Sequence, residues 1–264
     1  MFGKRFRLFS LLGFEVNIDL SWIVIAVLIV WSLATVAFPE WHPELSTAAH
    51  WAMGVMGTIG LFLSIIIHEL CHSLVARHYG LPMKGITLFI FGGVAEMHDN
   101  PPSPKAEALM ALAGPGASLV IGGLPYLLFV LGETVGWAAM GVGVLWYIAL
   151  INFVLLGFNL VPAFPLDGGR VLRAVLWGWR KNITWATRVS SAFGSGFGYL
   201  LIFLGIFAFI SRQFIAGLWW CLIGLFLKNA SQLSYRQLIV SRNLDGEPVD
   251  KLMHRNPVSV PERS

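Results

Sequence analysis

Two histidines and a glutamate in the string HELCH, residues 68–72, are the side chains best suited to hydrolytic chemistry. His68 and His72 are four residues apart, so a helix places both imidazoles on one face, about 6 Å apart. Two imidazole nitrogens at this spacing can bind one Zn²⁺ ion, and a glutamate directly after the first ligand can act as a general base toward an attacking water. We therefore expect His68 and His72 to be zinc ligands and Glu69 to be the catalytic base.

The surroundings of this string favour a metal site over its alternative, a metal-free cluster of hydrogen bonds between packed helices. HELCH lies inside a long apolar run, residues 52–77. A carboxylate and two imidazoles inside a membrane are costly unless they have a function. His68 precedes Arg77, the expected cytoplasmic end of the run, by nine residues. It would then lie about 13 Å below the surface, so hydrolysis there requires a polar cavity open to the cytoplasm.

A third ligand is needed, because a catalytic zinc site has three protein ligands and one open position. His78 follows His68 by ten residues, but Val75 occupies the position where a glycine would have to turn the chain back. In a continuous helix His78 would lie about 15 Å from His68 along the axis, which excludes it as a ligand.

Asp167 is the better candidate for the third ligand. It is the only acidic residue between Glu133 and Asp245, and it follows two prolines that end the preceding helix. Gly168 and Gly169 permit the tight backbone needed to direct a carboxylate inward. The alternative is that Asp167 caps the segment that begins near Gly169. The spacing alone leaves both interpretations open.

The composition predicts that transmembrane helices position these residues. The chain has 264 residues, of which 56% are apolar and 12% charged, whereas about 25% are charged in a typical soluble domain. The apolar residues form long blocks, which is typical of an α-helical polytopic membrane protein. The two cysteines lie far apart in apolar runs and form no disulfide framework, and no nucleic-acid-binding motif is visible. The expected spans are roughly residues 20–38, 52–77, 106–131, 137–160, 193–210 and 214–230.

The basic residues set the expected orientation. If the N-terminus is cytoplasmic, six spans place both termini in the cytoplasm. Every lysine and arginine except Arg212 then faces the cytoplasm, as the positive-inside rule requires. The first span is expected to be a retained signal anchor. We therefore expect a multi-pass protein of the cell membrane.

Two regions interrupt the spans. Residues 80–100 are rich in glycine and β-forming residues and too short for a transmembrane helix, so we expect a re-entrant β-hairpin on the cytoplasmic side. Residues 159–170 contain two prolines, which predicts extended backbone. The sequence becomes polar after about Ser231. The expected division is a transmembrane domain, residues 1–231, and a cytoplasmic segment, residues 232–264.

The chain resembles the site-2 protease family of intramembrane zinc metalloproteases, in its prokaryotic multi-pass form. HELCHSLVARHYG (68–80) fits the family's HExxH motif with its spaced alanine and glycine, and NLVPAFPLDGGR (159–170) fits the second signature. FGGVAEM (91–97) and ALAGPGASL (111–119) look like the family's glycine-bearing hairpin and GPG motif. The resemblance covers roughly residues 15–230.

The resemblance implies one Zn²⁺ ion held by His68, His72 and Asp167, with Glu69 as the base in peptide-bond hydrolysis. It also implies that Asn159 holds the substrate or the developing oxyanion. Asn152 is a weaker candidate, whose alternative role is a hydrogen bond between helices. The hairpin is expected to bind an unwound substrate segment as an added strand. Its expected contact residues are Phe91, Gly92, Gly93 and Val94.

The implied substrates are membrane-spanning regulatory proteins, cut within or near their transmembrane segments, as in regulated intramembrane proteolysis. Residues 249–264 resemble the opening of a CBS domain, a paired module that often binds adenine nucleotides, so we expect a longer natural protein. Three other functions compete with this interpretation: an inactive scaffold or sensor of the same fold, a transporter with a metal-lined path, and a membrane-embedded prenyl-protein protease. The intact HELCH and LDGG strings argue against all three.

Overall fold

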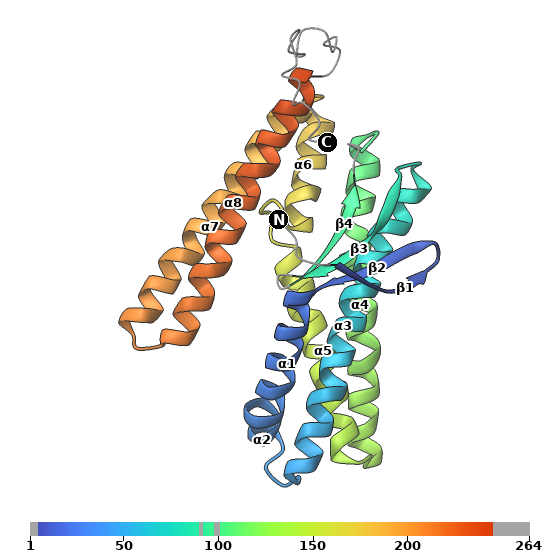
Figure 1. The fold of residues 1–264 in the computed structure, drawn as a ribbon, viewed down its shortest axis with the longest axis vertical. Coiled ribbons are helices and arrows are strands. Elements are labelled where there is room, and N and C mark those ends of the chain that lie inside the picture. Colours follow the sequence, from blue (N-terminus) through green and yellow to red (C-terminus); the bar gives the residue numbers. More distant parts are fainter. Residues whose placement is uncertain (1–4, 90–91, 98–100, 245–264) are drawn as a thin grey trace, which may run out of the picture.

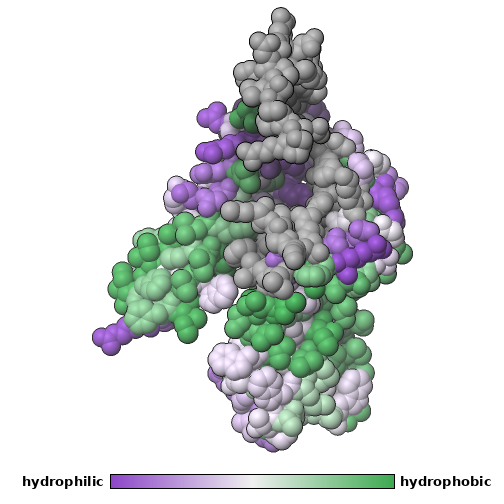
Figure 2. Space-filling view, in the orientation of Figure 1, coloured by the Kyte–Doolittle hydropathy of each residue, from purple (hydrophilic) through white to green (hydrophobic). Residues whose placement is uncertain are grey.

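The computed structural model describes residues 5–89, 92–97 and 101–244 (Figure 1). In this part of the chain six helical segments are long and apolar enough to cross a membrane, which confirms the expected number of spans. Figure 2 shows apolar side chains gathered over the lower half of the visible face and over the arm on its left, with hydrophilic side chains mostly above them. The spans are Trp22–Trp41, Thr47–His78, Pro104–Val135, Ala139–Asn159, Ile183–Ile210 and Phe214–Val240.

The helices follow one another with short connections, apart from the strands between the second and third spans. The first span comprises α1 (Leu20–Ser32), a π-helical turn (Leu33–Ala37) and α2 (Phe38–Trp41). The remaining helices are α3 (Thr47–His78), α4 (Pro104–Val135), α5 (Ala139–Asn159), α6 (Asp167–Arg180), α7 (Ile183–Ile210) and α8 (Phe214–Leu244). In Figure 1, α1, α3, α4 and α5 form one bundle, whereas α7 and α8 run side by side as a separate arm.

Local sequence explains where several helices begin and end. The Ser46 hydroxyl accepts a hydrogen bond from the Ala49 amide at the start of α3, and Ser103 does the same for the Ala106 amide at the start of α4. Each satisfies one of the amides that the first helical turn leaves without a partner. α4 ends at Gly136, whose φ of 76° is a left-handed conformation that glycine adopts without strain.

Four strands form one sheet in the order β1-β2-β3-β4. The strands are β1 (Arg5–Leu11), β2 (Phe14–Asp19), β3 (Met83–Phe89) and β4 (Gly92–Met97). β3 and β4 are antiparallel, which confirms the expected hairpin within residues 80–100. β2 pairs with β3 in parallel, so the hairpin is part of a larger sheet than the sequence indicated. The two strands before position 20 were not predicted from the sequence.

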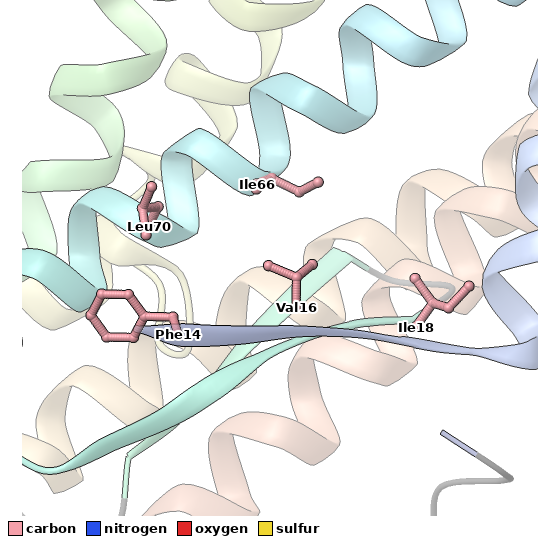
Figure 3. Packing of buried hydrophobic residues seen from close by; sticks show 5 residues of the cluster. All are labelled: Phe14, Val16, Ile18, Ile66 and Leu70. Atoms are coloured by element: carbon pink, nitrogen blue, oxygen red, sulfur yellow. The ribbon is translucent and has the colours of Figure 1, made fainter. Parts of the chain in front are cut away.

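The first hairpin folds because β2 buries its alternate side chains. Phe14, Val16 and Ile18 point to one face, as the period of two in a strand requires. They pack against Ile66 and Leu70 of α3 (Figure 3). The apolar–polar alternation from position 14 to 19 was the signal that predicts this strand. The sheet thus lies directly on the helix that carries HELCH.

The second interruption ends in a helix rather than in extended backbone up to residue 170. A turn covers residues 160–166, and α6 begins at Asp167. Arg173 of α6 forms a buried ion pair with Glu107 of α4, and the Ser231 hydroxyl of α8 donates a hydrogen bond to the Phe164 carbonyl. These contacts attach the turn and α6 to two different helices. α8 itself runs unbroken through position 231, where the composition changes.

The CBS-like stretch, residues 249–264, lies outside the described residues. Phe91 of the expected substrate-binding hairpin also lies outside them.

Candidate metal centre

Three buried side chains from two distant elements converge on one point. His68 and His72 of α3 and Asp167 at the start of α6 are only 6%, 6% and 7% exposed. The two Nε2 atoms are 3.1 Å apart, and each lies 3.2 Å from Oδ2 of Asp167. A tetrahedral zinc site with bonds of about 2.0–2.2 Å places its ligand atoms roughly 3.3–3.5 Å apart. The observed separations fit a single ion.

The hydrogen bonds of the imidazoles also fit a bound cation. Nδ1 of His72 lies 2.6 Å from the Met110 carbonyl oxygen, which can only accept, so Nδ1 carries the proton. The Nε2 atom of a neutral imidazole then presents a lone pair to the group. Nδ1 of His68 lies 2.9 Å from the Ser118 hydroxyl. A lone pair on Nε2 of His72 beside the Asp167 carboxylate is an arrangement that a cation at the centre of the group would stabilise.

α4 shapes the space around this group. Met110 and Ser118 lie on either side of Gly114, and a methyl group added at Gly114 would collide with Nε2 of both His72 and His68. The absence of a side chain there keeps the space between the ligand nitrogens open. The GPG string was noticed in the sequence, but the role of its first glycine and of the flanking Met110 carbonyl and Ser118 was missed. Only the fold brings positions 110–118 onto the two histidines.

Asp167 is held by close backbone packing around the first turn of α6. Added methyl groups at Gly168 and Gly169 would strike the backbone of Leu160 and Phe164. These glycines therefore permit close approach of the preceding turn, and neither has the positive φ that a special conformation would require. The capping interpretation of Asp167 was wrong: it is the first residue of the helix, Leu166 occupies the cap position, and the carboxylate faces the imidazoles.

The Glu107–Arg173 pair supports the same turn from the α4 side. Glu107 is fully buried, and the Arg173 guanidinium also stacks 4.9 Å from the Phe164 ring. Burial lowers the pKa of the Arg173 guanidinium from its ordinary value, and the Glu107 carboxylate opposes that effect. Removing one partner of a buried pair leaves an uncompensated charge, which is strongly destabilising. The pair therefore fixes α6, and with it Asp167, against the helix that contacts both histidines.

Glu69 differs from the three converging residues in its exposure. It follows His68 on α3 and is partly exposed, whereas the candidate ligands are buried. A general base needs access to water and substrate, and a ligand is best held away from bulk water. The exposure of the four side chains thus agrees with the roles that the sequence predicts for them.

The other predicted residues lie at different positions. Asn152 is buried and donates to the Ser64 hydroxyl of α3 at 2.9 Å, which confirms the interhelical hydrogen bond. Asn159 is the partly exposed last residue of α5, at the start of the turn that leads to Asp167. Gly92, Gly93 and Val94 lie in β4, an edge strand that contacts α3. His78 is exposed, contacts the Tyr79 ring edge-on and is not part of the metal-binding group.

Comparisons with known proteins agree with this geometry. Residues 56–142 and 133–204 match the sequence profile of peptidase family M50. The chain is 33% identical to Rip3 of Mycobacterium tuberculosis over 94% of its own length, and 32% identical to sll0528 of Synechocystis over 98%. Zinc metalloprotease MJ0392 of Methanocaldococcus jannaschii is 30% identical over 96% of the chain. The matched regions span 63% of Rip3 and 67% of each of the other two proteins.

A solved structure shares the fold as well. The site-2 protease from Methanocaldococcus jannaschii superimposes with a TM-score of 0.58 at 27% sequence identity. The similarity covers 87% of this chain and 94% of that one. The likeness therefore extends over most of both chains.

Proposed function

Because this chain belongs to peptidase family M50, the site-2 protease family, we propose that it is a zinc-dependent intramembrane protease. Its substrates would be membrane-bound regulatory proteins, cut within or near their transmembrane segments. The observation that carries the proposal is the convergence of His68, His72 and Asp167 on one point. The two histidines and Glu69 lie on α3, a helix long and apolar enough to span a membrane. An inactive scaffold of the same fold would have no reason to keep this complete set.

Each side chain has a distinct task in the proposed reaction. His68, His72 and Asp167 would hold the zinc ion, which when bound supplies Lewis-acid activation of water and of the substrate carbonyl. Glu69 accepts a proton from the attacking water and later donates it to the nitrogen of the leaving amine. The hydrogen bonds to Ser118 and the Met110 carbonyl orient both imidazoles, and the Met110 carbonyl also fixes the His72 tautomer that metal binding requires.

The substrate would bind as an extended segment. A helical substrate hides its carbonyls in its own hydrogen bonds, so it must unwind before attack. β4 is an edge strand and contacts α3, so a substrate strand paired with Gly92, Gly93 and Val94 would lie near HELCH. Asn159 has a side-chain amide at the start of the ligand-bearing turn. We assign it to binding the substrate backbone or the developing oxyanion.

The proposal extends to orientation and regulation. We assign both termini to the cytoplasm because the basic residues flank the spans on that side. A reporter domain that is active only in the cytoplasm should be active when it is fused to either terminus. Activity of a reporter that works only outside the cytoplasm would contradict the proposed topology. We also propose that the CBS-like stretch, residues 249–264, belongs to a module that binds an adenine nucleotide.

The deciding experiment compares Glu69→Gln with a matched control, Glu133→Gln, which changes an exposed glutamate near the end of α4. Both purified variants should retain zinc, because neither residue is a ligand. Cleavage of a membrane-embedded test substrate should be lost in Glu69→Gln and unchanged in Glu133→Gln. Cleavage by Glu69→Gln at the wild-type rate would refute the proposed mechanism. Comparing membrane proteomes of cells that carry active enzyme or Glu69→Gln should then reveal the uncut substrate.

A further inference from the structure

Arg170 lies beside the candidate metal centre and has no role in the scheme above. It is one helical turn after Asp167 in α6, so both side chains leave the same side of that helix. The side chain is partly buried, and its Nη2 atom is buried without a hydrogen-bond partner among the described residues. A buried charged donor without an acceptor is costly, and such groups call for an explanation.

The neighbouring arginine shows what a structural role looks like in this helix. Arg173 pairs with Glu107 and stacks on Phe164, so both its charge and its flat face have partners. The same pair already fixes α6 against α4, so Arg170 is not needed for that task. Among the described residues nothing accepts from the buried N–H donor of Arg170, which leaves it for an acceptor such as a bound substrate.

The surroundings of Arg170 identify this acceptor. Arg170 lies three residues after Asp167 on α6, and its guanidinium is close enough to Glu69 to act on that carboxylate electrostatically. The unpartnered donor therefore lies between the candidate ligand Asp167 and the candidate base Glu69. When water adds to a peptide carbonyl, negative charge develops on the carbonyl oxygen. Donors already aimed at that charge contribute strongly to catalysis. An arginine remains protonated throughout, so it donates a hydrogen bond without transferring a proton.

We propose that Arg170 is a catalytic residue that donates a hydrogen bond from Nη2 to the carbonyl oxygen of the scissile peptide bond as negative charge develops there. The inference rests on the proposed protease function and adds an oxyanion donor to it. It also gives the last residue of the LDGGR string a task distinct from that of its aspartate.

The test uses Arg170→Gln, Arg170→Lys and Arg170→Ala in the full chain. The matched control is Arg188→Gln, which changes an exposed arginine on α7. We expect Arg170→Gln to lower kcat about 10²–10³-fold, with KM and zinc content close to wild type. Guanidinium ion added to Arg170→Ala should restore part of the rate, because it can occupy the vacated space. It should not accelerate Arg188→Gln.

A phosphinic peptide provides a readout independent of turnover. Its tetrahedral, anionic oxygens imitate the charge that Arg170 is proposed to bind. Its affinity should fall in Arg170→Gln by about the same factor as kcat, while substrate KM changes little. Unchanged affinity for this peptide, together with no rescue by guanidinium, would overturn the assignment.

Two further outcomes keep the test decisive. If Arg170→Gln does not fold, Arg170→Lys retains the charge and should fold and bind zinc, yet lose at least tenfold in kcat. A wild-type rate in Arg170→Lys would contradict the need for a guanidinium N–H. If Arg170→Gln is fully active and Glu69→Gln is inactive, only the role assigned to Arg170 is refuted. If Glu69→Gln is active, the proposed protease function itself is refuted.

Discussion

Removal of the Ser118 hydroxyl should weaken zinc binding without touching a ligand. Ser118 is fully buried and lies 2.9 Å from Nδ1 of His68. Ser118→Ala leaves the buried Nδ1 of His68 without this hydrogen-bond partner and frees the ring to rotate. Loss of such an outer hydrogen bond typically costs 10- to 100-fold in metal affinity, or about 1.4–2.7 kcal/mol at roughly 1.4 kcal/mol per tenfold.

Ser190→Ala is a closely matched control. Ser190 is also fully buried in a spanning helix, but its hydroxyl has no hydrogen-bond partner among the described residues. The two substitutions remove the same atom at the same degree of burial and differ only in the bond to His68. Competition between each purified protein and a chromogenic zinc chelator measures the affinities. Equal zinc affinities for Ser118→Ala and Ser190→Ala would refute the claim that the hydrogen bond between Ser118 and His68 supports zinc binding.

Three other changes test the metal centre and its support. Removing metal with a chelator should abolish cleavage, and stoichiometric Zn²⁺ should restore it; a full rate in the metal-free protein would contradict the mechanism. Gly114→Ala should abolish zinc binding, because the added methyl collides with both Nε2 atoms. Normal zinc content in this variant would show that the missing side chain at Gly114 is not needed for metal binding. Glu107→Gln should destabilise the protein by about 3–5 kcal/mol by leaving the Arg173 charge buried and unpaired. Thermal unfolding in detergent measures this, and an unchanged Tm would show that the pair does not support α6.

The membrane helices and the converging residues could be predicted from sequence because their signals are local or chemically rare. A long apolar run predicts a span by its length alone, and the observed α3 contains the expected run at 52–77. HELCH and Asp167 are conspicuous because titratable groups are scarce in such a chain. His68 and Asp167 are 99 positions apart in sequence. Their convergence could be predicted only because a catalytic zinc ion requires a third protein ligand.

The features that were missed depend on contacts that sequence spacing does not encode. β2 has a clear alternation, but a six-residue strand beside a long apolar helix is easily taken for part of its flank. Its parallel pairing with β3 joins segments on either side of two spans. The Met110 carbonyl is invisible in principle, because every residue has one. α6 was obscured by the prolines before it, which end one helix but do not prevent another from starting.

Zinc content and coordination of the purified protein test the central claim most directly. X-ray absorption at the zinc edge should show one ion per chain with two imidazole nitrogens and one carboxylate oxygen among its ligands. Asp167→Asn should lose the oxygen ligand and most of the metal. A wild-type protein without zinc, or an unchanged spectrum in Asp167→Asn, would contradict the account.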